Sequence, residues 1–351
     1  MTPIRPLIMK IVQIVPRLPP EVCGVGDYSL ALAHDLQAKG IETTFVVGKS
    51  EDNIGNQTPN GFDTYHIQRR SADSLQQTLS QIDFDAIVLQ YSGYGYAKRG
   101  APLWLSEGLG RIRRPILTMF HELYAFSSPW SSAFWLCPLM KFSARRIAKM
   151  SSVRFTNRQA SANWLQLPTK VVPVFSNFGE PEVSKVPMAR ERSLVCFGYQ
   201  ADAFPMFLGA LRVAIDQIKP TRLISIGRRT ERLNDLQGLC PTEWTGVLSG
   251  VDISKILQES RFGFLAYHSE YLGKSGILAS YAAHGVCPIL AGTNKPLSDG
   301  LVFGKNIASP WDCGGVSVES IVEASQNWYS NHSIEKTAEL YSKALIGLME
   351  I

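Results

Sequence analysis

Short apolar strands alternate with amphipathic helices along almost the whole chain, and this alternation constrains the fold more than any other feature. The first repeat contains an apolar, β-branched run at 10–15, a glycine-containing loop, a helix over 28–39 that stops at Gly40, and a second apolar run at 42–47. Asp27 is placed to cap the helix. A strand, a helix and a strand in so short a stretch predict a βαβ unit with buried, parallel strands.

The same alternation continues, stops, and then starts again. In the first series we expect further strands at 85–91, 115–120, 152–156 and 171–175, and helices at 102–112 and 129–149. The periodicity is lost over 176–187, where glycine, proline and charge accumulate, so we place the domain boundary there. In the second series we expect strands at 193–198, 222–227 and 262–266, and helices at 205–217, 254–260 and 335–349.

The predicted fold class is therefore α/β, with two Rossmann-like doubly wound domains that face each other across a cleft. A chain of 351 residues is long enough for two domains that each bury a core. The expected domains are residues 1–180 and 190–330. A C-terminal helix within 331–351 is expected to pack back on the first domain.

Composition limits the class of protein. Hydrophobic residues make up 45% of the chain and charged residues 19%, which is typical of a soluble globular protein. The net charge of +5 suits an anionic small molecule or a membrane surface but is too weak to predict a nucleic-acid partner, so none is expected. Without a secretory segment or an apolar run of about 20 residues, the chain is expected to be cytoplasmic. The six cysteines form no Cys-x-x-Cys pair, which favours reduced thiols over a zinc site or disulfides.

The segment from Glu270 to Leu290 has the character of an anion site. Lys274, Ser275 and the glycines on either side, Gly273 and Gly276, precede an apolar, alanine-rich helix. The backbone N–H groups of a first helical turn, the helix dipole and a lysine would all favour a diphosphate at that point. The spacing is not that of a Walker loop. A surface loop in which Gly and Ser only cap the helix is the alternative.

Three further motifs resemble GT-B glycosyltransferases, in particular the nucleotide-sugar family four. They are Gly24-Val-Gly26-Asp27-Tyr28-Ser29 near the start, Thr245-Gly246, and Ala283-His-Gly-Val-Cys-Pro-Ile289. They follow the family's order over most of the chain. The resemblance implies that the first domain binds the acceptor and the second binds a nucleotide-sugar donor.

The donor half departs from the family pattern. Family four carries two glutamates with seven residues between them, but alignment on Gly285 puts Ser280 in the second position, and Glu270 lies ten residues before it. The usual Arg and Lys of the first donor loop are absent after Gly198, where Tyr199 follows. Lys274 together with Arg228, which follows a strand that ends at a glycine, is expected to supply the positive charge instead.

The candidate site residues follow from these motifs and from the expected strand ends. The catalytic candidates are His121 and Glu122. The resemblance implies a histidine directed at the donor sugar, and the adjacent Glu122 is expected to orient it or to act as a base. A buried, hydrogen-bonded histidine is the alternative. The donor-binding candidates are Gly198, Tyr199, Arg228, Thr245, Gly246, Glu270, Gly273, Lys274, Ser275 and Gly276. The acceptor-binding candidates are Gly24, Gly26, Asp27, Tyr91, Tyr94 and Arg99, of which the tyrosines would stack on sugar rings.

The region 123–149 mixes aromatic and basic residues, among them Phe126, Trp130 and Trp135 with Arg145 and Lys149. Such a pattern predicts either peripheral contact with anionic lipids, at the inner face of the membrane, or a packed helix with a basic, solvated side.

The predicted activity is transfer of a sugar from a nucleotide-diphosphate sugar to a hydroxyl of a saccharide, a lipid-linked saccharide or a small molecule, as in polysaccharide biosynthesis. No cofactor or metal is expected, because the only Asp-x-Asp, Asp83 to Asp85, precedes a strand instead of ending one. The resemblance favours retention of configuration. A catalytically inactive binding or scaffold protein of the same fold and a sugar-nucleotide epimerase are the alternatives.

Overall fold

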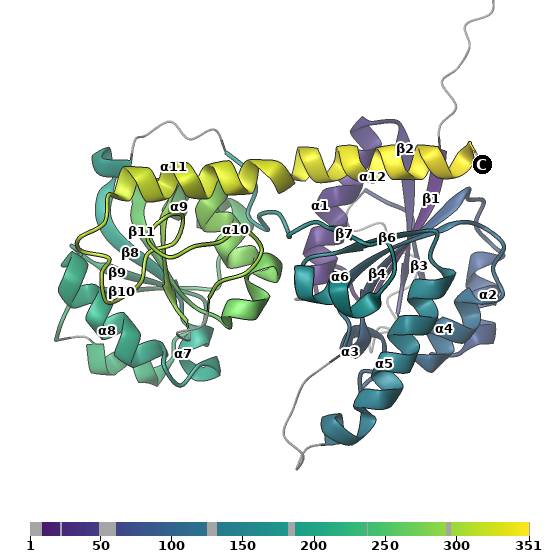
Figure 1. Ribbon diagram of the computed structural model, residues 1–351, viewed down its shortest axis with the longest axis horizontal. Helices are drawn as coiled ribbons and strands as arrows, with labels where there is room; N and C mark the ends of the chain where they lie inside the picture. Colours follow the sequence, from purple (N-terminus) through teal and green to yellow (C-terminus); the bar gives the residue numbers. More distant parts are fainter. Residues whose placement is uncertain are drawn as a thin grey trace, which may run out of the picture. The chain divides into compact units, whose positions relative to one another are not determined.

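The computed structural model describes residues 9–21, 23–48, 61–124, 132–181, 187–236, 238–292 and 296–350. These residues form two compact units, shown in Figure 1. Unit 1 comprises residues up to Val172 together with those from Thr337 onward, and unit 2 runs from Pro173 to Lys336.

Unit 1 is built on a parallel sheet of seven strands in the order β3-β2-β1-β4-β5-β6-β7. The strands are β1 (Met9–Val15), β2 (Ile41–Val47), β3 (Thr64–His66), β4 (Ala86–Ser92), β5 (Ile116–Glu122), β6 (Val153–Thr156) and β7 (Lys170–Val171). The central strands are apolar along nearly their whole length because helices cover both faces of the sheet.

The helices of unit 1 are α1 (Gly24–Ala38), α2 (Ala72–Leu79), α3 (Gly93–Tyr96), α4 (Leu103–Leu109), α5 (Ser132–Met150), α6 (Gln159–Leu165) and the C-terminal α12 (Ile334–Met349). One face of the sheet packs against α2, α4 and α5 through Leu75, Leu105 and Ile147. On the other face Ala33 of α1 packs with Phe45 of β2. Side chains that alternate along a strand therefore reach two separate cores.

Unit 2 has a parallel sheet of five strands in the order β10-β9-β8-β11-β12. The strands are β8 (Glu191–Phe197), β9 (Leu223–Ile226), β10 (Thr242–Gly246), β11 (Ser260–Ala266) and β12 (Cys287–Ala291). The helices are α7 (Tyr199–Ala203), α8 (Phe207–Ile218), α9 (Gly250–Glu259), α10 (Gly276–Ala283) and α11 (Val318–Tyr329), with short 3₁₀ turns η1 (Pro187–Ala189), η2 (Glu231–Leu236), η3 (Ser269–Lys274) and η4 (Ser330–His332). The core on one face involves α8 and α11, and that on the other involves α9 and α10.

Most of the expected strands and helices are present within two residues of their expected bounds. Asp27 does not cap α1, because the helix begins earlier, at Gly24, and Asp27 is already inside its first turn, with its N–H bonded to the carbonyl of Cys23 at 2.9 Å. The last expected strand of unit 1 shrinks to Lys170–Val171. The helix α11 has no counterpart among the expected elements.

Candidate functional site

The loops that follow β8, β9 and β10 meet at the carboxyl edge of the unit 2 sheet. The N–H of Gly227 donates to the carbonyl of Gly246 at 2.9 Å, which joins the ends of β9 and β10. A β-carbon built on Gly198 would lie 3.1 Å from the carbonyl oxygen of Arg228, so the loop after β8 touches the loop after β9. Gly227 and Gly246 have positive φ values of 100° and 69°, which favour glycine there. Ligands of open α/β sheets bind at this edge.

The loop after β11 brings a lysine to the start of a helix at the same edge. It forms the 3₁₀ turn η3, which ends at Lys274, and Ser275 then caps α10 by accepting a hydrogen bond from the N–H of Leu278 at 3.2 Å. The ammonium of Lys274 lies 5.4 Å from the ring centre of Tyr271. Lys274 therefore directly precedes the capped start of α10, and the amino-terminal dipole of this helix favours an anion.

The segment that follows β7 packs against this helix start. The N–H of Val174 donates to the carbonyl of Gly273 at 2.9 Å. A β-carbon on Gly276 would lie 2.9 Å from the amide nitrogen of Asn177, so only glycine allows this approach. Asn177 therefore places a neutral amide beside the first turn of α10, where it could donate to a bound oxyanion.

The other donor candidates differ in accessibility. Arg228, Glu270 and Tyr199 are exposed, and Tyr199 exposes 57% of its surface. Within the described ranges the guanidinium of Arg228 has no recorded hydrogen bond or ion pair, and it follows a strand end as predicted. Thr245 uses its hydroxyl on the backbone, at 2.9 Å from the carbonyl oxygen of Gly246.

Two serines of the segment are structural. Ser275 is 4% exposed and its hydroxyl accepts the capping bond, so the expected side-chain contact with a ligand is not supported. Ser280 is completely buried, with its Oγ 2.7 Å from the carbonyl oxygen of Gly276 and 3.0 Å from Oγ of Ser176. Ser280, at the position of the family's second glutamate, thus forms its hydrogen bonds inside unit 2.

In unit 1, His121 lies within a chain of buried polar side chains. Its Nε2 is 2.8 Å from Oε1 of Gln90, and Nε2 of Gln90 donates to Oε1 of Gln13 at 2.8 Å. With Gln90 oriented in this way, Nε2 of His121 donates to Oε1 of Gln90. His121 is 8% exposed, so its orientation is set by these contacts.

One buried tyrosine lies beside the histidine, and a second buried tyrosine lies near the first. The ring of Tyr28, in α1, meets the imidazole edge to face at 5.0 Å. Burial raises the pKa of Tyr28 and also that of Tyr341 in α12, and each hydroxyl adds to the electrostatic environment of the other. The C-terminal helix therefore contributes a polar side chain to the same core of unit 1 that holds His121.

Glu122 is positioned by an irregularity between β4 and β5. The register of the two strands shifts between Tyr91 and Ser92, so that Ser92 pairs with Glu122. The hydroxyl of Ser92 donates to Oε2 of Glu122 at 3.4 Å. Such bulges redirect side chains at the end of a strand. His121 and Glu122 are the last two residues of β5, as the expected strand end implies.

The acceptor candidates divide into exposed and buried groups. Tyr91 is fully buried in the core of unit 1 and cannot stack on a sugar, so this prediction was wrong. Tyr94, 40% exposed, and Arg99 remain accessible. Asp27 is partly buried, and burial raises the pKa of its carboxyl group.

Glycines bring the loops of this site close together. A β-carbon on Gly26 would lie 2.5 Å from the carbonyl oxygen of Arg17, and one on Gly95 would lie 2.6 Å from Cβ of Pro16. The first turn of α1 and the short α3 therefore both pack on the loop after β1. Gly24 is exposed, whereas Gly26 is buried and serves this packing.

Sequence reasoning missed Gln13, Gln90 and Asn177. The two glutamines lie in the middle of otherwise apolar strands, which was the available signal, since a lone amide in a buried strand requires a partner. The sequence around Asn177 gives no comparable signal, because this residue lies in the segment 176–187, where the periodicity is lost.

No cluster of three or more His, Cys, Asp or Glu side chains that could hold a metal ion occurs within the described ranges. Over the same ranges, none of the helices combines the length and the apolar character needed to cross a membrane.

Neither a protein-family model nor a curated protein sequence matches the chain. Solved structures do match it. A glycosyltransferase from Rickettsia africae has a TM-score of 0.63 at 12% identity, covering 97% of this chain and 98% of its own. An alpha-glucosyltransferase in complex with UDP-glucose and DNA containing an abasic site gives 0.61 at 11% identity, covering 97% and 99%. HepE from Anabaena, in complex with UDP and glucose, gives 0.60 at 12% identity, covering 97% and 100%. The likeness, together with two parallel α/β units, confirms the predicted GT-B fold class.

Proposed function

We propose that this protein is a glycosyltransferase that moves a sugar from a nucleotide-diphosphate sugar to a hydroxyl group. The observation that carries the proposal is the placement of Lys274 directly before the capped start of α10, at the carboxyl edge of the unit 2 sheet. UDP or UDP-glucose is bound in several structures of the same fold, which supports a nucleotide-sugar donor.

The leaving diphosphate is the group that unit 2 would stabilise. Negative charge builds up on it as the bond to the sugar breaks, and fixed cations and backbone dipoles act most strongly where charge develops. Lys274, the first turn of α10 and the exposed Arg228 supply these, with Asn177 as a further donor. In the proposed mechanism no metal ion is required for this step.

Unit 1 would hold the acceptor and position His121 and Glu122. Exposed Tyr94 and Arg99 would contact a saccharide, a lipid-linked saccharide or a small molecule. Glu122, next to Ser92, would orient the reacting groups in a retaining reaction, whereas in an inverting reaction it would accept the proton of the attacking hydroxyl. Retention of configuration is proposed because of the resemblance to family four, and family four membership is itself part of the proposal.

The location proposed is the cytoplasm, with a role in polysaccharide biosynthesis. The expectation of no nucleic-acid partner gains no support, because some structures of the same fold contain DNA. It stays a prediction, and DNA therefore belongs among the ligands to be tested.

Titration calorimetry with UDP, GDP and ADP tests the donor site. We expect one nucleotide to bind, and the matching nucleotide sugars should be turned over when candidate acceptors are added. If none of the three nucleotides binds, the enzyme proposal fails.

A catalytically inactive protein of the same fold is the second candidate. The burial of Ser280 favours it, because no carboxylate stands where family four binds the ribose. In that case a nucleotide would bind but no sugar would be transferred. Product analysis without acceptor also distinguishes an epimerase, which would convert the nucleotide sugar on its own.

A further inference from the structure

Helix α5 of unit 1 has one buried face and one exposed face. Ala144, Ile147 and Ala148 are buried in the core beside α4. On the opposite side Trp135 exposes 74% of its surface and Phe142 55%. Exposing large aromatic side chains to water costs free energy, so this outer face is suited to contact with an apolar surface.

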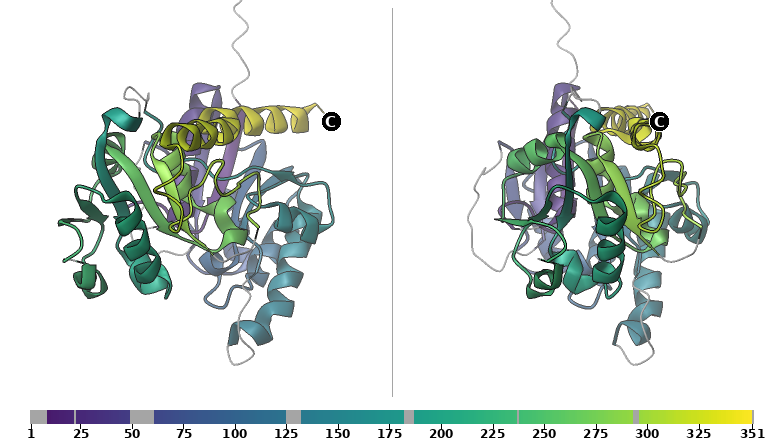
Figure 2. Two further views of the ribbon diagram at one scale, coloured as in Figure 1. Left: turned by 60° about the vertical axis from the view of Figure 1, so that its left-hand side comes forward. Right: turned by 90° about the vertical axis from the view of Figure 1, so that its left-hand side faces the viewer.

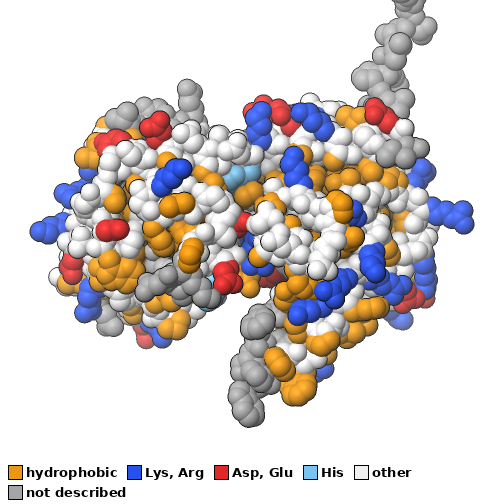
Figure 3. All heavy atoms as spheres, viewed as in Figure 1, with side chains coloured by type: hydrophobic (Ala, Val, Ile, Leu, Met, Phe, Trp, Pro, Cys, Tyr) orange, Lys and Arg blue, Asp and Glu red, His pale blue; other side chains and the backbone are white. Residues whose placement is uncertain are grey.

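The same outer face is strongly basic. Four cations, Lys141, Arg145, Arg146 and Lys149, lie within α5, and the sequence from 132 to 150 contains no Asp or Glu. No ion pair of these four cations is recorded among the described residues. In Figure 3, blue and orange side chains lie together on the part of unit 1 that α5 builds.

Neighbouring aromatic rings orient two of the cations without neutralising them. The ammonium of Lys141 lies 4.7 Å from the ring centre of Tyr124, and the guanidinium carbon of Arg145 lies 4.5 Å from that of Trp164. Cation–π contacts of this kind leave the positive charge in place. Among the described residues, α5 therefore presents four cations without a recorded ion pair, two of which are held against aromatic rings.

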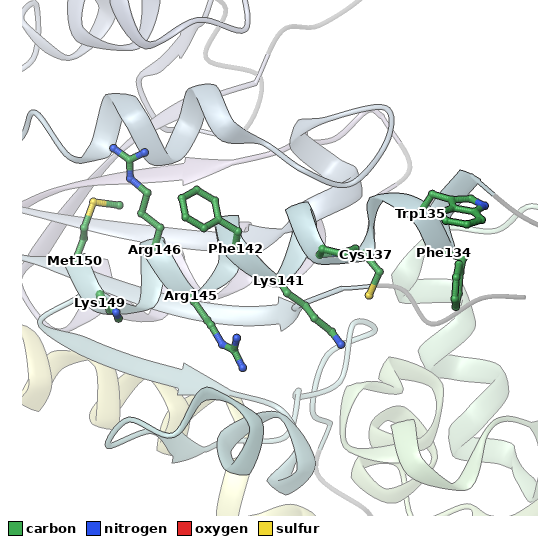
Figure 4. Close-up of a pocket in the computed structure, with 10 residues that line it drawn as sticks. Phe134, Trp135, Cys137, Lys141, Phe142, Arg145, Arg146, Lys149 and Met150 are labelled. Carbon is green, nitrogen blue, oxygen red and sulfur yellow. The ribbon is translucent and has the colours of Figure 1, made fainter. Parts of the chain in front are cut away.

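A hollow of about 1000 Å³ follows this face. Figure 4 shows the aromatic side chains of Phe134 and Trp135 at one end of the helix, while Lys141 and Arg145 point to a common side further along. Trp135 and Lys149 are separated by about 20 Å at the usual helical rise. The amino-terminal end of α5 projects beyond the sheet of unit 1 in Figures 1 and 2.

We propose that α5 docks the protein on the surface of an anionic lipid bilayer. Trp135, Phe134 and Phe142 enter the boundary between headgroups and acyl chains, and the cations lie at the level of the lipid phosphates. Charge complementarity selects an anionic surface. The exposed aromatics select a bilayer over a nucleic acid duplex, whose outer surface offers phosphates but no apolar layer. This proposal goes beyond the proposed transfer reaction and does not depend on it.

Co-sedimentation with vesicles tests the proposal. The full-length protein is mixed with vesicles of phosphatidylcholine alone, or of phosphatidylcholine with about one third phosphatidylglycerol, at low and high salt. We expect binding to the anionic vesicles only, and weaker binding at high salt. The double variant Arg146→Glu/Lys149→Glu should lower the partition coefficient by roughly a thousandfold, because two attractive charges become repulsive.

Matched variants distinguish the effect of this surface on vesicle binding from the effects of the total charge and the number of exposed aromatic residues. Arg113→Glu/Lys305→Glu changes the net charge equally at exposed sites outside α5 and should bind as the unaltered protein does. Trp135→Ala should weaken binding several-fold, while Trp311→Ala, at a tryptophan that is 58% exposed in unit 2, should not. Circular dichroism and thermal unfolding of each variant report whether it is folded.

Three results would overturn the proposal. The first is equal binding to neutral and anionic vesicles, and the second is an equal loss of vesicle binding in the control variants. The third is binding to a duplex DNA oligonucleotide that depends on Arg146 and Lys149, without binding to vesicles. The last result would assign the surface to nucleic acid.

Discussion

The Nε2 atom of His121 lies 2.8 Å from the side-chain oxygen of Gln90, and Gln90 in turn donates to Gln13. The three residues come from β5, β4 and β1, so the arrangement spans the centre of the unit 1 sheet. It holds the imidazole in one orientation, with Nε2 as the donor to Gln90. If His121 acts in catalysis, changes at Gln90 should alter the pH dependence of sugar transfer.

Replacing Gln90 by glutamate tests this link. A carboxylate next to His121 stabilises the imidazolium, so the pKa of His121 should rise by about one unit or more, and the pH profile of sugar transfer should move with it. Gln90→Leu removes the hydrogen-bond acceptor and should lower kcat by about tenfold or more. A pH profile that is unchanged in both variants, with only a loss of thermal stability, would assign His121 a structural role.

Removing the ammonium of Lys274 should weaken nucleotide binding. Lys274→Ala should cost about 1–3 kcal/mol of UDP affinity, the range for a charge-assisted contact, and Arg228→Ala should also weaken binding. Calorimetry gives both values. Lys255→Ala is the matched control, because Lys255 is an exposed lysine of unit 2 that pairs with Asp252 on the same helix. An affinity that Lys274→Ala leaves unchanged excludes the lysine from the site.

Gly26 should tolerate no side chain. A β-carbon there would meet the backbone oxygen of Arg17 at 2.5 Å, so Gly26→Ala should lower the free energy of unfolding by about 1–3 kcal/mol. Gly209, exposed in α8, provides the contrast, because a β-carbon added to it would meet nothing within 4 Å. Gly209→Ala should stabilise the protein by about 0.5–1 kcal/mol. Urea unfolding measures both, and equal effects would contradict the packing argument.

His284 should make unit 2 sensitive to acid. Burial lowers the pKa of its imidazole to about 4, and the neutral ring donates from Nδ1 to the carbonyl of Ser280 at 2.7 Å and accepts from the hydroxyl of Ser254 at 2.9 Å. Between the ordinary histidine pKa of about 6.5 and this value, the unfolded chain binds a proton that the folded chain does not. Stability should therefore fall by about 1.4 kcal/mol per pH unit as the pH drops through that window.

Comparing the free energy of unfolding at pH 7 and pH 5 tests whether stability falls as the pH drops. His284→Asn keeps a donor for the carbonyl of Ser280 but does not titrate, so its stability should vary less with pH. A steeper loss in His284→Asn than in the unaltered protein would disprove the assignment.

Local patterns were sufficient for the architecture. Apolar strands, helix periodicity and glycines at strand ends placed most strands and helices, because buried parallel strands and amphipathic helices leave a direct mark on residue order. They also placed His121 and Glu122 at the end of β5 and Lys274 at a helix start. The predicted cap by Asp27 is wrong because α1 begins at Gly24, earlier than its apolar spacing indicates.

The sequence by itself determined two α/β series, the strand ends at which the candidate site residues lie, and the basic and aromatic content of α5. Only the tertiary structure decided which residues are accessible. Tyr91 and Ser280 are chemically suited to bind a ligand but are buried, whereas Asn177 lies in an irregular segment and is brought to α10 by the fold. Residue type sets what a side chain can do, but contacts between distant parts of the chain set its burial, its partners and its protonation.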